Sequence, residues 1–314
     1  MEMPCLPMPV RLWRLGAFED NEYMMQEGEV IIIVGNGFDV NHSIPSSYVN
    51  FKTWLGNNDK ELYYFLERYI DVGGDWWNDF EKSLSEIDVP KLIRETPLEN
   101  RPRDPKLPPD FSYPASWRLD SVHRAISQKF TEWVKTLDSV DIKKKIDLPE
   151  ARLFISFNYT DTLERVYGIE ENRIVYIHGK ASRGDKLIYG HGKNQFVIED
   201  NVMRKYKLHR SDDFLTAGTY GSSESELTSH ISYWQKYIQI GCYYDVLRPA
   251  VSGASNVCVY GLSFSEVDYP YLQWIAERNR NLEWRVSWHT EKDKERIRNT
   301  FRALRVKDYE MFEM

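Results

Sequence analysis

Residues that could carry out chemistry follow several short apolar runs of the sequence. They comprise Gly35, Asn36, Gly37, Phe38 and Asp39 after EVIIIV, Asn158 after RLFISF, His178 after RIVYI, His191 after KLIYG, and Gly261, Ser263 and Asp268 after NVCVY. Glycine lets an anion approach backbone N–H groups, and an imidazole takes up a proton near neutral pH. This combination suits a site that binds a phosphate and moves a proton.

The segment from Gly35 to Asp39 is the candidate phosphate-binding turn. Gly35 and Gly37 permit positive φ and close approach of a phosphate to the backbone, and Asp39 could accept a hydrogen bond from a ribose hydroxyl or hold the loop. The segment is not the dinucleotide fingerprint G-x-G-x-x-G, because residue 40 is Val. A plain tight turn is the alternative interpretation.

Asn158 and His178 are the candidate catalytic residues. The Asn158 carboxamide offers a donor and an acceptor, which could hold a ribose hydroxyl or a water. His178 could act as a general base. A turn-forming Asn and a structural His are the alternatives. His191, in a second His-Gly-Lys sequence, is a rival for the role of base, and spacing does not separate the two histidines.

The late segment GLSFSEVD offers a third group of contacts. Gly261 predicts a turn, and Ser263 could contact a ligand. Helix capping accounts for Ser265 and Asp268 without a ligand. By contrast, Glu81 lies off an apolar stripe and is predicted to be solvated.

The elements that would position these residues alternate between strands and helices. Apolar runs predict strands within 29–35, 152–162, 173–180, 186–193, 256–268 and 283–289, and periodicity predicts helices at 47–55, 60–70, 75–87, 119–137, 223–248, 270–278 and 291–304. Such alternation predicts a Rossmann-like α/β fold, in which a mostly parallel sheet has helices on both faces. Ligands of these folds bind at the carboxyl ends of the strands, where most of the candidate residues fall.

The domain organisation predicted from composition is simple. Residues 1–28 form an irregular N-terminal extension, and 29–314 form a single domain. Seven of the fourteen prolines lie within 90–114, which predicts a long loop there. The segment 180–210 holds eight Lys or Arg against three Asp or Glu. This basic insertion is either a solvated face or an attraction for an anionic ligand.

Bulk properties exclude several functional classes. The net charge of −7 argues against a dedicated nucleic-acid site. No apolar run approaches the roughly 18 residues of a membrane span, and the N-terminus lacks a signal-peptide core. Three cysteines without a C-x-x-C pair argue against a cysteine zinc site and a disulfide framework. We therefore expect a cytoplasmic protein without a metal.

Five segments together resemble the AbiH family, bacterial proteins linked to abortive infection by phage. These are GNGFDVNHSIPSSYVNF, FISFNYTDTLERVYG, YIHGK, LIYGHGKN and VYGLSFSEVDYPYL. They occur in the order and with the neighbours of the family, over most of residues 29–300. The resemblance implies a role in antiviral defence.

The same segments are similar to the sirtuin-type NAD-binding fold. The matching residues are Gly35-Asn36-Gly37-Phe38-Asp39 on the sirtuin G-A-G-x-S, Ile44-Pro45 on its I-P, Asn158 on the Asn of Q-N-x-D, His178-Gly179 on the catalytic H-G, and Gly261 with Ser263 on the late G-T-S. The resemblance implies an NAD glycohydrolase. In it Asn158 and His178 are catalytic. We expect the glycine turn, Asp39, His191, Gly261, Ser263 and Asp268 to bind NAD or a related nucleotide.

Two departures limit what the sirtuin resemblance implies. Ser46-Ser47-Tyr48 stands in place of D-F-R, and the zinc module is absent. A peptide substrate is therefore not expected, whereas the part that binds and cleaves NAD is kept.

Two other functions remain open from the sequence. One is a nucleotide sensor that acts through a partner without cleavage, and the other is a metal-dependent nuclease using Asp39, Asp161 and Asp268. A phage-derived trigger or partner protein and a homo-oligomer also stay open, and no membrane partner is expected.

Overall fold

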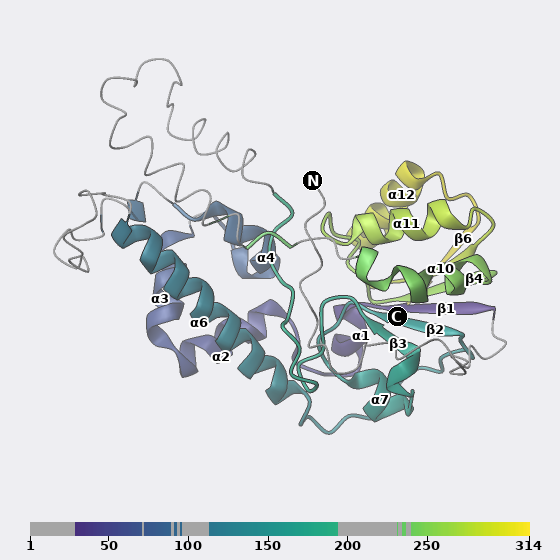
Figure 1. Cartoon of the computed structure of the whole chain (residues 1–314), viewed down its shortest axis with the longest axis horizontal. Helices are drawn as coiled ribbons and strands as arrows, with labels where there is room; N and C mark the ends of the chain where they lie inside the picture. The colour runs from purple at the N-terminus through teal and green to yellow at the C-terminus, as the bar shows by residue number, and fades with distance from the viewer. Residues whose placement is uncertain are drawn as a thin grey trace, which may run out of the picture. The chain divides into compact units, whose positions relative to one another are not determined.

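A computed structural model describes residues 29–70, 72–88, 91, 92, 95, 113–193, 231, 234–236 and 240–314 (Figure 1). The predicted extension at 1–28 lies outside the described residues. So do most of the Pro-rich loop at 90–114, the basic segment beyond residue 193, and most of the predicted helix at 223–248 before residue 240.

A six-stranded sheet, parallel throughout, forms the centre of the fold, in the order β3-β2-β1-β4-β5-β6. Its strands are β1 (Val30–Val34), β2 (Leu153–Ser156), β3 (Ile174–Tyr176), β4 (Asn256–Tyr260), β5 (Glu283–Trp288) and β6 (Tyr309–Glu313). The prediction of a Rossmann-like α/β fold is confirmed. β1 to β4 are almost wholly apolar, as strands buried on both faces must be.

The carboxyl ends of four strands lie level with one another. Val34 pairs with Ser156 on one side and with Tyr260 on the other, and Ser156 pairs with Tyr176. The segments that follow β1, β2, β3 and β4 therefore leave the sheet side by side, as the sequence predicted.

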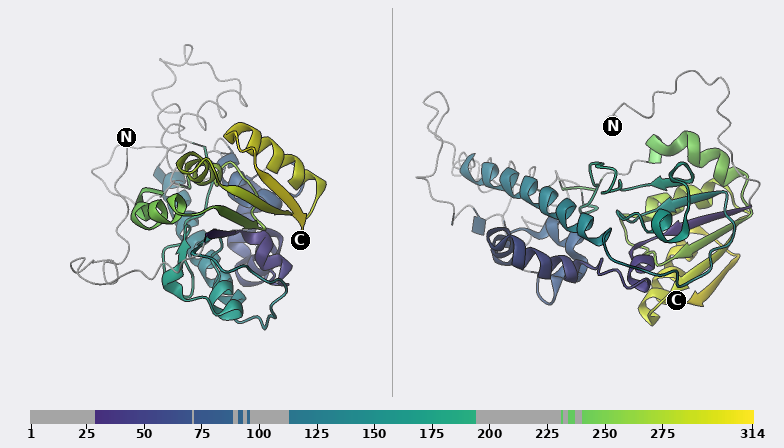
Figure 2. Two further views of the ribbon diagram at one scale, coloured as in Figure 1. Left: turned by 90° about the vertical axis from the view of Figure 1, so that its right-hand side faces the viewer. Right: turned by 90° about the horizontal axis from the view of Figure 1, so that it is seen from below.

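Helices cover both faces of the sheet (Figures 1 and 2). α10 (Tyr244–Ser252), α11 (Tyr269–Arg278) and α12 (Glu291–Leu304) pack on one face, and α1 (Asn36–Asn41) and α7 (Thr162–Tyr167) on the other. α12 begins with a capping box, in which Thr290 Oγ accepts from the N–H of Asp293 and the Asp293 carboxylate accepts from the N–H of Thr290.

One strand prediction is wrong, and one strand of the sheet was not predicted. The run 186–193 is not a strand of the sheet: its one bridge joins His191 to Gln235, and its apolar side chains Leu187 and Tyr189 are buried without strand pairing. β6 was not predicted, because Tyr309–Glu313 lacks the β-branched run that marks the other strands.

The contacts within the chain divide it into two compact units. The sheet unit comprises 1–46, 134–187 and 238–314, and the helical unit comprises 47–133 and 188–237. The interval 29–314, expected to be one domain, thus contributes to both units.

The helical unit is built from α2 (Tyr48–Asn58), α3 (Lys60–Tyr69), α4 (Phe80–Ser83), short 3-10 turns at Trp76–Asp79 and Leu84–Glu86, and α6 (Tyr113–Leu137) as far as Trp133. Phe51 is at its centre, with ring centroids of Phe80, Phe130 and Trp133 at 5.5, 5.4 and 5.0 Å. The predicted amphipathic helix at 119–137 is confirmed, since its periodic residues from Leu119 to Leu137 are buried.

Glu81 is a correction within the helical unit. It accepts a hydrogen bond from the Tyr48 hydroxyl and forms an ion pair with Lys236, whose Nζ lies 3.0 Å from Glu81 Oε2. The Glu81 side chain is 14% exposed, so it is not the solvated glutamate that its place off the apolar stripe predicted.

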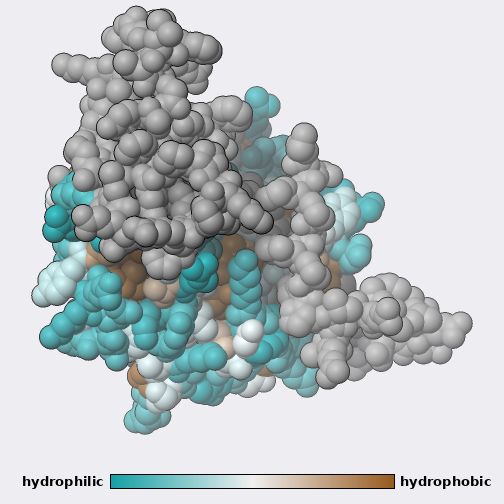
Figure 3. All heavy atoms as spheres, turned by 60° about the vertical axis from the view of Figure 1, so that its left-hand side comes forward, coloured by the Kyte–Doolittle hydropathy of each residue, from teal (hydrophilic) through white to brown (hydrophobic). Residues whose placement is uncertain are grey.

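Hydrophilic residues dominate the described surface in the view of Figure 3. No helix in the described part of the chain is long and apolar enough to cross a membrane.

Candidate functional site

The candidate site lies where the chain changes direction across the sheet. After β1 the chain builds β2 and β3 on one side, then returns to build β4, β5 and β6 on the other. Ligands of open α/β sheets bind in the crevice beyond the strand ends at such a switch point. The turns after β1 and β4 meet there.

Glycines let these two turns pack backbone against backbone. A Cβ on Gly37 would lie 2.8 Å from the Cα of Gly261, and a Cβ on Gly261 would lie 2.1 Å from the N of Phe38. Gly261 also has a φ of +63°. No larger residue fits this approach.

The same packing changes the interpretation of the glycine turn. The N–H of Gly35 donates to the carbonyl oxygen of Tyr260 at 2.9 Å, and the N–H of Gly37 donates to that of Gly261 at 2.8 Å. Both N–H groups that were predicted to bind a phosphate therefore have acceptors within the protein. The glycines serve close packing here, and Asn36 is the exposed residue of the turn.

Asp39 is buried at the centre of the site. It projects from α1, and the Thr160 hydroxyl donates to its Oδ2 at 2.6 Å. Burial raises the pKa of Asp39 from 3.8 to about 6, although hydrogen bonding from Thr160, Thr162 and Asn158 acts in the opposite direction. The carboxylate is thus held in the turn at a cost in free energy.

We expect Asp39→Asn to stabilise the protein at pH 7. Between pH 4 and 6 the folded chain keeps a proton on Asp39 that the unfolded chain has lost, so stability falls as the pH rises through this window. A shift of about two pKa units corresponds to about 3 kcal/mol. The variant should gain up to that amount in free energy of unfolding at pH 7, and the gain should vanish near pH 4.

Urea unfolding from pH 4 to 7 tests this, with the exposed Asp147→Asn as the matched control. If the free energies of unfolding of wild type and Asp39→Asn differ by the same amount at every pH, the expected burial of a charge is contradicted.

Asn158 follows β2 and lies beside Asp39. Its side chain is 5% exposed. Neither Asn158 Oδ1 nor Asp39 Oδ1 has a hydrogen-bond partner among the described residues, although both atoms are buried. Buried polar atoms nearly always have partners, and exceptions call for an explanation.

His178 and Asp268 form a buried pair. His178 Nε2 lies 3.4 Å from Asp268 Oδ1, and the two residues are 1% and 7% exposed. Ser265 Oγ donates to the other carboxylate oxygen of Asp268 at 2.8 Å. The rings of Phe157 and Tyr271 stand edge-on to the imidazole. An imidazole oriented by a carboxylate is the arrangement of a general base and its positioning partner.

This pairing was not predicted from the sequence. Asp268 precedes α11 at the N-cap position, but its side chain makes no capping hydrogen bond. The capping interpretation of the Asp268 side chain is therefore wrong.

The other predicted site residues are placed differently. His191 belongs to the helical unit and is fully buried. Its Nε2 donates to the carbonyl of Ile231 at 3.0 Å, and its Nδ1 accepts from the N–H of Lys193 at 3.2 Å. Ser263 is exposed, and its carbonyl accepts from Arg296. Phe38 is buried against His42, with ring centroids 4.5 Å apart.

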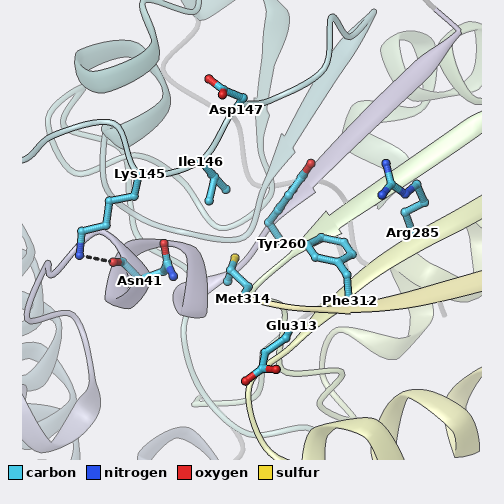
Figure 4. Close-up of a pocket in the computed structure, with 9 residues that line it drawn as sticks. All are labelled: Asn41, Lys145, Ile146, Asp147, Tyr260, Arg285, Phe312, Glu313 and Met314. Carbon is cyan, nitrogen blue, oxygen red and sulfur yellow. Dashed lines mark hydrogen bonds between the residues drawn. The ribbon is translucent and has the colours of Figure 1, made fainter.

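A cavity of about 640 Å³ opens beside the end of α1 (Figure 4). It is lined by Asn41, Lys145, Ile146, Asp147, Tyr260, Arg285, Phe312, Glu313 and Met314. None of these residues was predicted to belong to a site, because they come from separate segments of the sequence.

Carboxylates in the described part of the chain form no metal cluster. No group of three or more His, Cys, Asp or Glu residues is placed there to hold an ion. Asp39, Asp161 and Asp268, proposed above for a nuclease, therefore do not converge in that way.

Comparison with known proteins identifies a family. A family model described as bacteriophage abortive infection AbiH matches residues 31–288, which is well over half of the chain. The matched range runs from β1 to the end of β5. No curated protein matches the chain.

Proposed function

The chain belongs to the AbiH family of bacteriophage abortive infection proteins, and on that premise we propose that it cleaves the nicotinamide–ribose bond of NAD or a related nucleotide. The reaction would take place at the site formed by Asp39, Asn158, His178 and Asp268. The resemblance of the strand-end segments to the sirtuin-type fold supports the same chemistry.

One observation carries the proposal. Asp39 Oδ1 and Asn158 Oδ1 are buried acceptors without partners among the described residues. A ribose supplies hydroxyl donors, which match two such acceptors at the switch point of the sheet. Because both atoms are shielded from solvent, a ribose would reach them only after the strand-end segments move. A closed resting state suits an enzyme that would otherwise consume NAD in an uninfected cell.

For this reaction the protein needs only to position the nucleotide and the water and to supply one base. The C–N bond to nicotinamide breaks with its electron pair leaving on neutral nicotinamide, which creates an oxocarbenium-like ribose. A water adds to that carbon and gives its proton to His178. With Nε2 donating to Asp268, Nδ1 is the basic nitrogen. The products are nicotinamide, ADP-ribose and a proton.

The test is the NAD content of cells that express the protein during phage challenge. We expect NAD to fall and nicotinamide and ADP-ribose to rise after infection, in step with loss of the infected cells. Purified protein with extract of infected cells should release nicotinamide from NAD. Unchanged NAD in protected, infected cells would overturn the proposal.

The second candidate is a nucleotide sensor that acts through a partner protein. The enclosure of His178, which is 1% exposed, supports it, because a buried site suits a protein that closes around a bound nucleotide and holds it. Calorimetry with NAD, followed by chromatography of the mixture, separates the two functions. Binding without release of nicotinamide selects the sensor.

A further inference from the structure

The cavity beside α1 is separate from the strand-end site. It lies on the face of the sheet that carries α1 and α7, beneath β4, β5 and β6. Tyr260, Phe312 and Cys258 belong to the apolar residues of this face. Arg285 pairs with Cys258 in the register of β4 and β5, so the Arg285 side chain points to the same face. None of the lining residues takes part in the proposed cleavage of NAD.

The floor of the cavity is aromatic. The ring centroids of Tyr260 and Phe312 lie 5.6 Å apart at 69°. Ile146 and Met314 add apolar surface beside them (Figure 4). A volume of about 640 Å³ is within the range of small-molecule sites. Because the rings are tilted at 69°, a planar heterocycle can stack on one of them and meet the other edge-on.

Two cations at the cavity are available to an anion. Lys145 Nζ donates to the carbonyl of Asn41 at 2.6 Å and to Ser43 Oγ at 2.7 Å. Both acceptors are neutral, and no carboxylate among the described residues forms an ion pair with Lys145. Arg285 pairs with Glu310 at 3.3 Å, but both side chains are more than half exposed, and such pairs are weak.

The carboxylates that line the cavity do not cancel these charges. The Asp147 side chain is 95% exposed, so water screens its charge, and Lys144 lies 2.9 Å away. Glu313 follows Phe312 in β6, and successive side chains of a strand point to opposite faces. Figure 4 accordingly shows the Glu313 carboxylate directed away from Phe312 and Arg285.

We propose that this cavity is a second ligand site, which binds a nucleoside monophosphate. The base would stack on the half-buried ring of Phe312 and meet the buried Tyr260 edge-on, since aromatic side chains stack on any nucleobase. The phosphate would bind Arg285 or Lys145, because guanidinium and ammonium groups are the usual partners of phosphate. Asn41 lies two residues beyond Asp39 in α1, and Tyr260 directly precedes Gly261, so the ligand borders both turns of the strand-end site.

Titration of the full-length protein with adenosine 5′-monophosphate tests the proposal by calorimetry. We expect the monophosphate to bind at least about tenfold more tightly than adenosine, which lacks the phosphate, or inorganic phosphate, which lacks the base. Phe312→Ala should weaken the binding of the monophosphate and that of adenosine by the same factor. Arg285→Gln or Lys145→Gln should lower the affinity for the monophosphate about tenfold and leave the affinity for adenosine unchanged. Arg302→Gln, on the exposed side of α12, is the matched control and should bind as wild type does.

Three results would overturn the proposal. Wild type could fail to bind the monophosphate, or Arg285→Gln and Lys145→Gln could both bind it as tightly as wild type. Alternatively, Asn158→Ala could abolish binding that Arg285→Gln retains, which would place the nucleotide at the strand ends. Binding is measured without turnover, so this site stands or falls independently of the cleavage of NAD.

Discussion

Replacement of His178 by Ala lowers the rate of NAD cleavage by at least about 10²-fold, the smallest loss typical of a general base. The expected defect is in kcat, with KM little changed, because the imidazole accepts a proton and does not grip the nucleotide. Release of nicotinamide by purified protein measures it. Cells that express the variant should keep their NAD after infection and lose protection.

The comparison requires a folded variant and a matched histidine. Thermal unfolding of His178→Ala establishes the first, and the exposed His289→Ala provides the second and should cleave NAD at the wild-type rate. Asp268→Asn keeps the shape of the positioning residue but removes its charge. We expect it to lower kcat less than His178→Ala does, again without a change in KM. Wild-type kcat in a folded His178→Ala protein would exclude the imidazole as the base.

Replacement of Gly261 by Ala destabilises the protein by more than about 3 kcal/mol or prevents folding. Two penalties add at this position: the left-handed conformation costs a non-glycine residue about 1–2 kcal/mol, and the new Cβ collides with the backbone of Gly37 and Phe38. Backbone atoms cannot move aside without separating β1 from β4.

Gly168→Ala carries the first penalty, the left-handed conformation, without the collision. Gly168 has a φ of +66°, close to that of Gly261, but a Cβ there would meet nothing within 4 Å. We expect this variant to lose only about 1 kcal/mol. Urea unfolding of both variants gives the difference, which measures the close approach of the two turns. Equal losses would mean that the turns separate easily.

The sheet could be predicted because its central strands have a clear local sequence pattern. Apolar, β-branched runs that end in Gly, Asn or His mark β1 and β2 and the end of β3, and a parallel sheet then brings their ends together. The wrong strand prediction also has a simple cause. KLIYGHGK has an apolar run, but Leu187 and Tyr189 are buried without strand pairing, and no local signal separates the two outcomes.

Long-range pairs were beyond prediction from local patterns. His178 and Asp268 are 90 residues apart in the sequence, and Glu81 and Lys236 are 155 apart. Each residue has an ordinary local explanation, and only the folded chain brings it to its partner. The occupied N–H groups of Gly35 and Gly37 are a similar case, because their acceptors are the last residue of β4 and the residue after it.

The order of strands has a consequence for how the protein is made. β1 is flanked by β2 and β4, and its residue Val30 pairs with Asn256, so one neighbour is synthesised long after the other. At roughly 5–20 residues per second, a ribosome needs on the order of ten seconds or more to reach β4. Throughout that interval one edge of an apolar strand stays open to pairing with other chains. Newly made protein should therefore depend on chaperones, and overproduction should favour aggregates unless translation is slow or the temperature low.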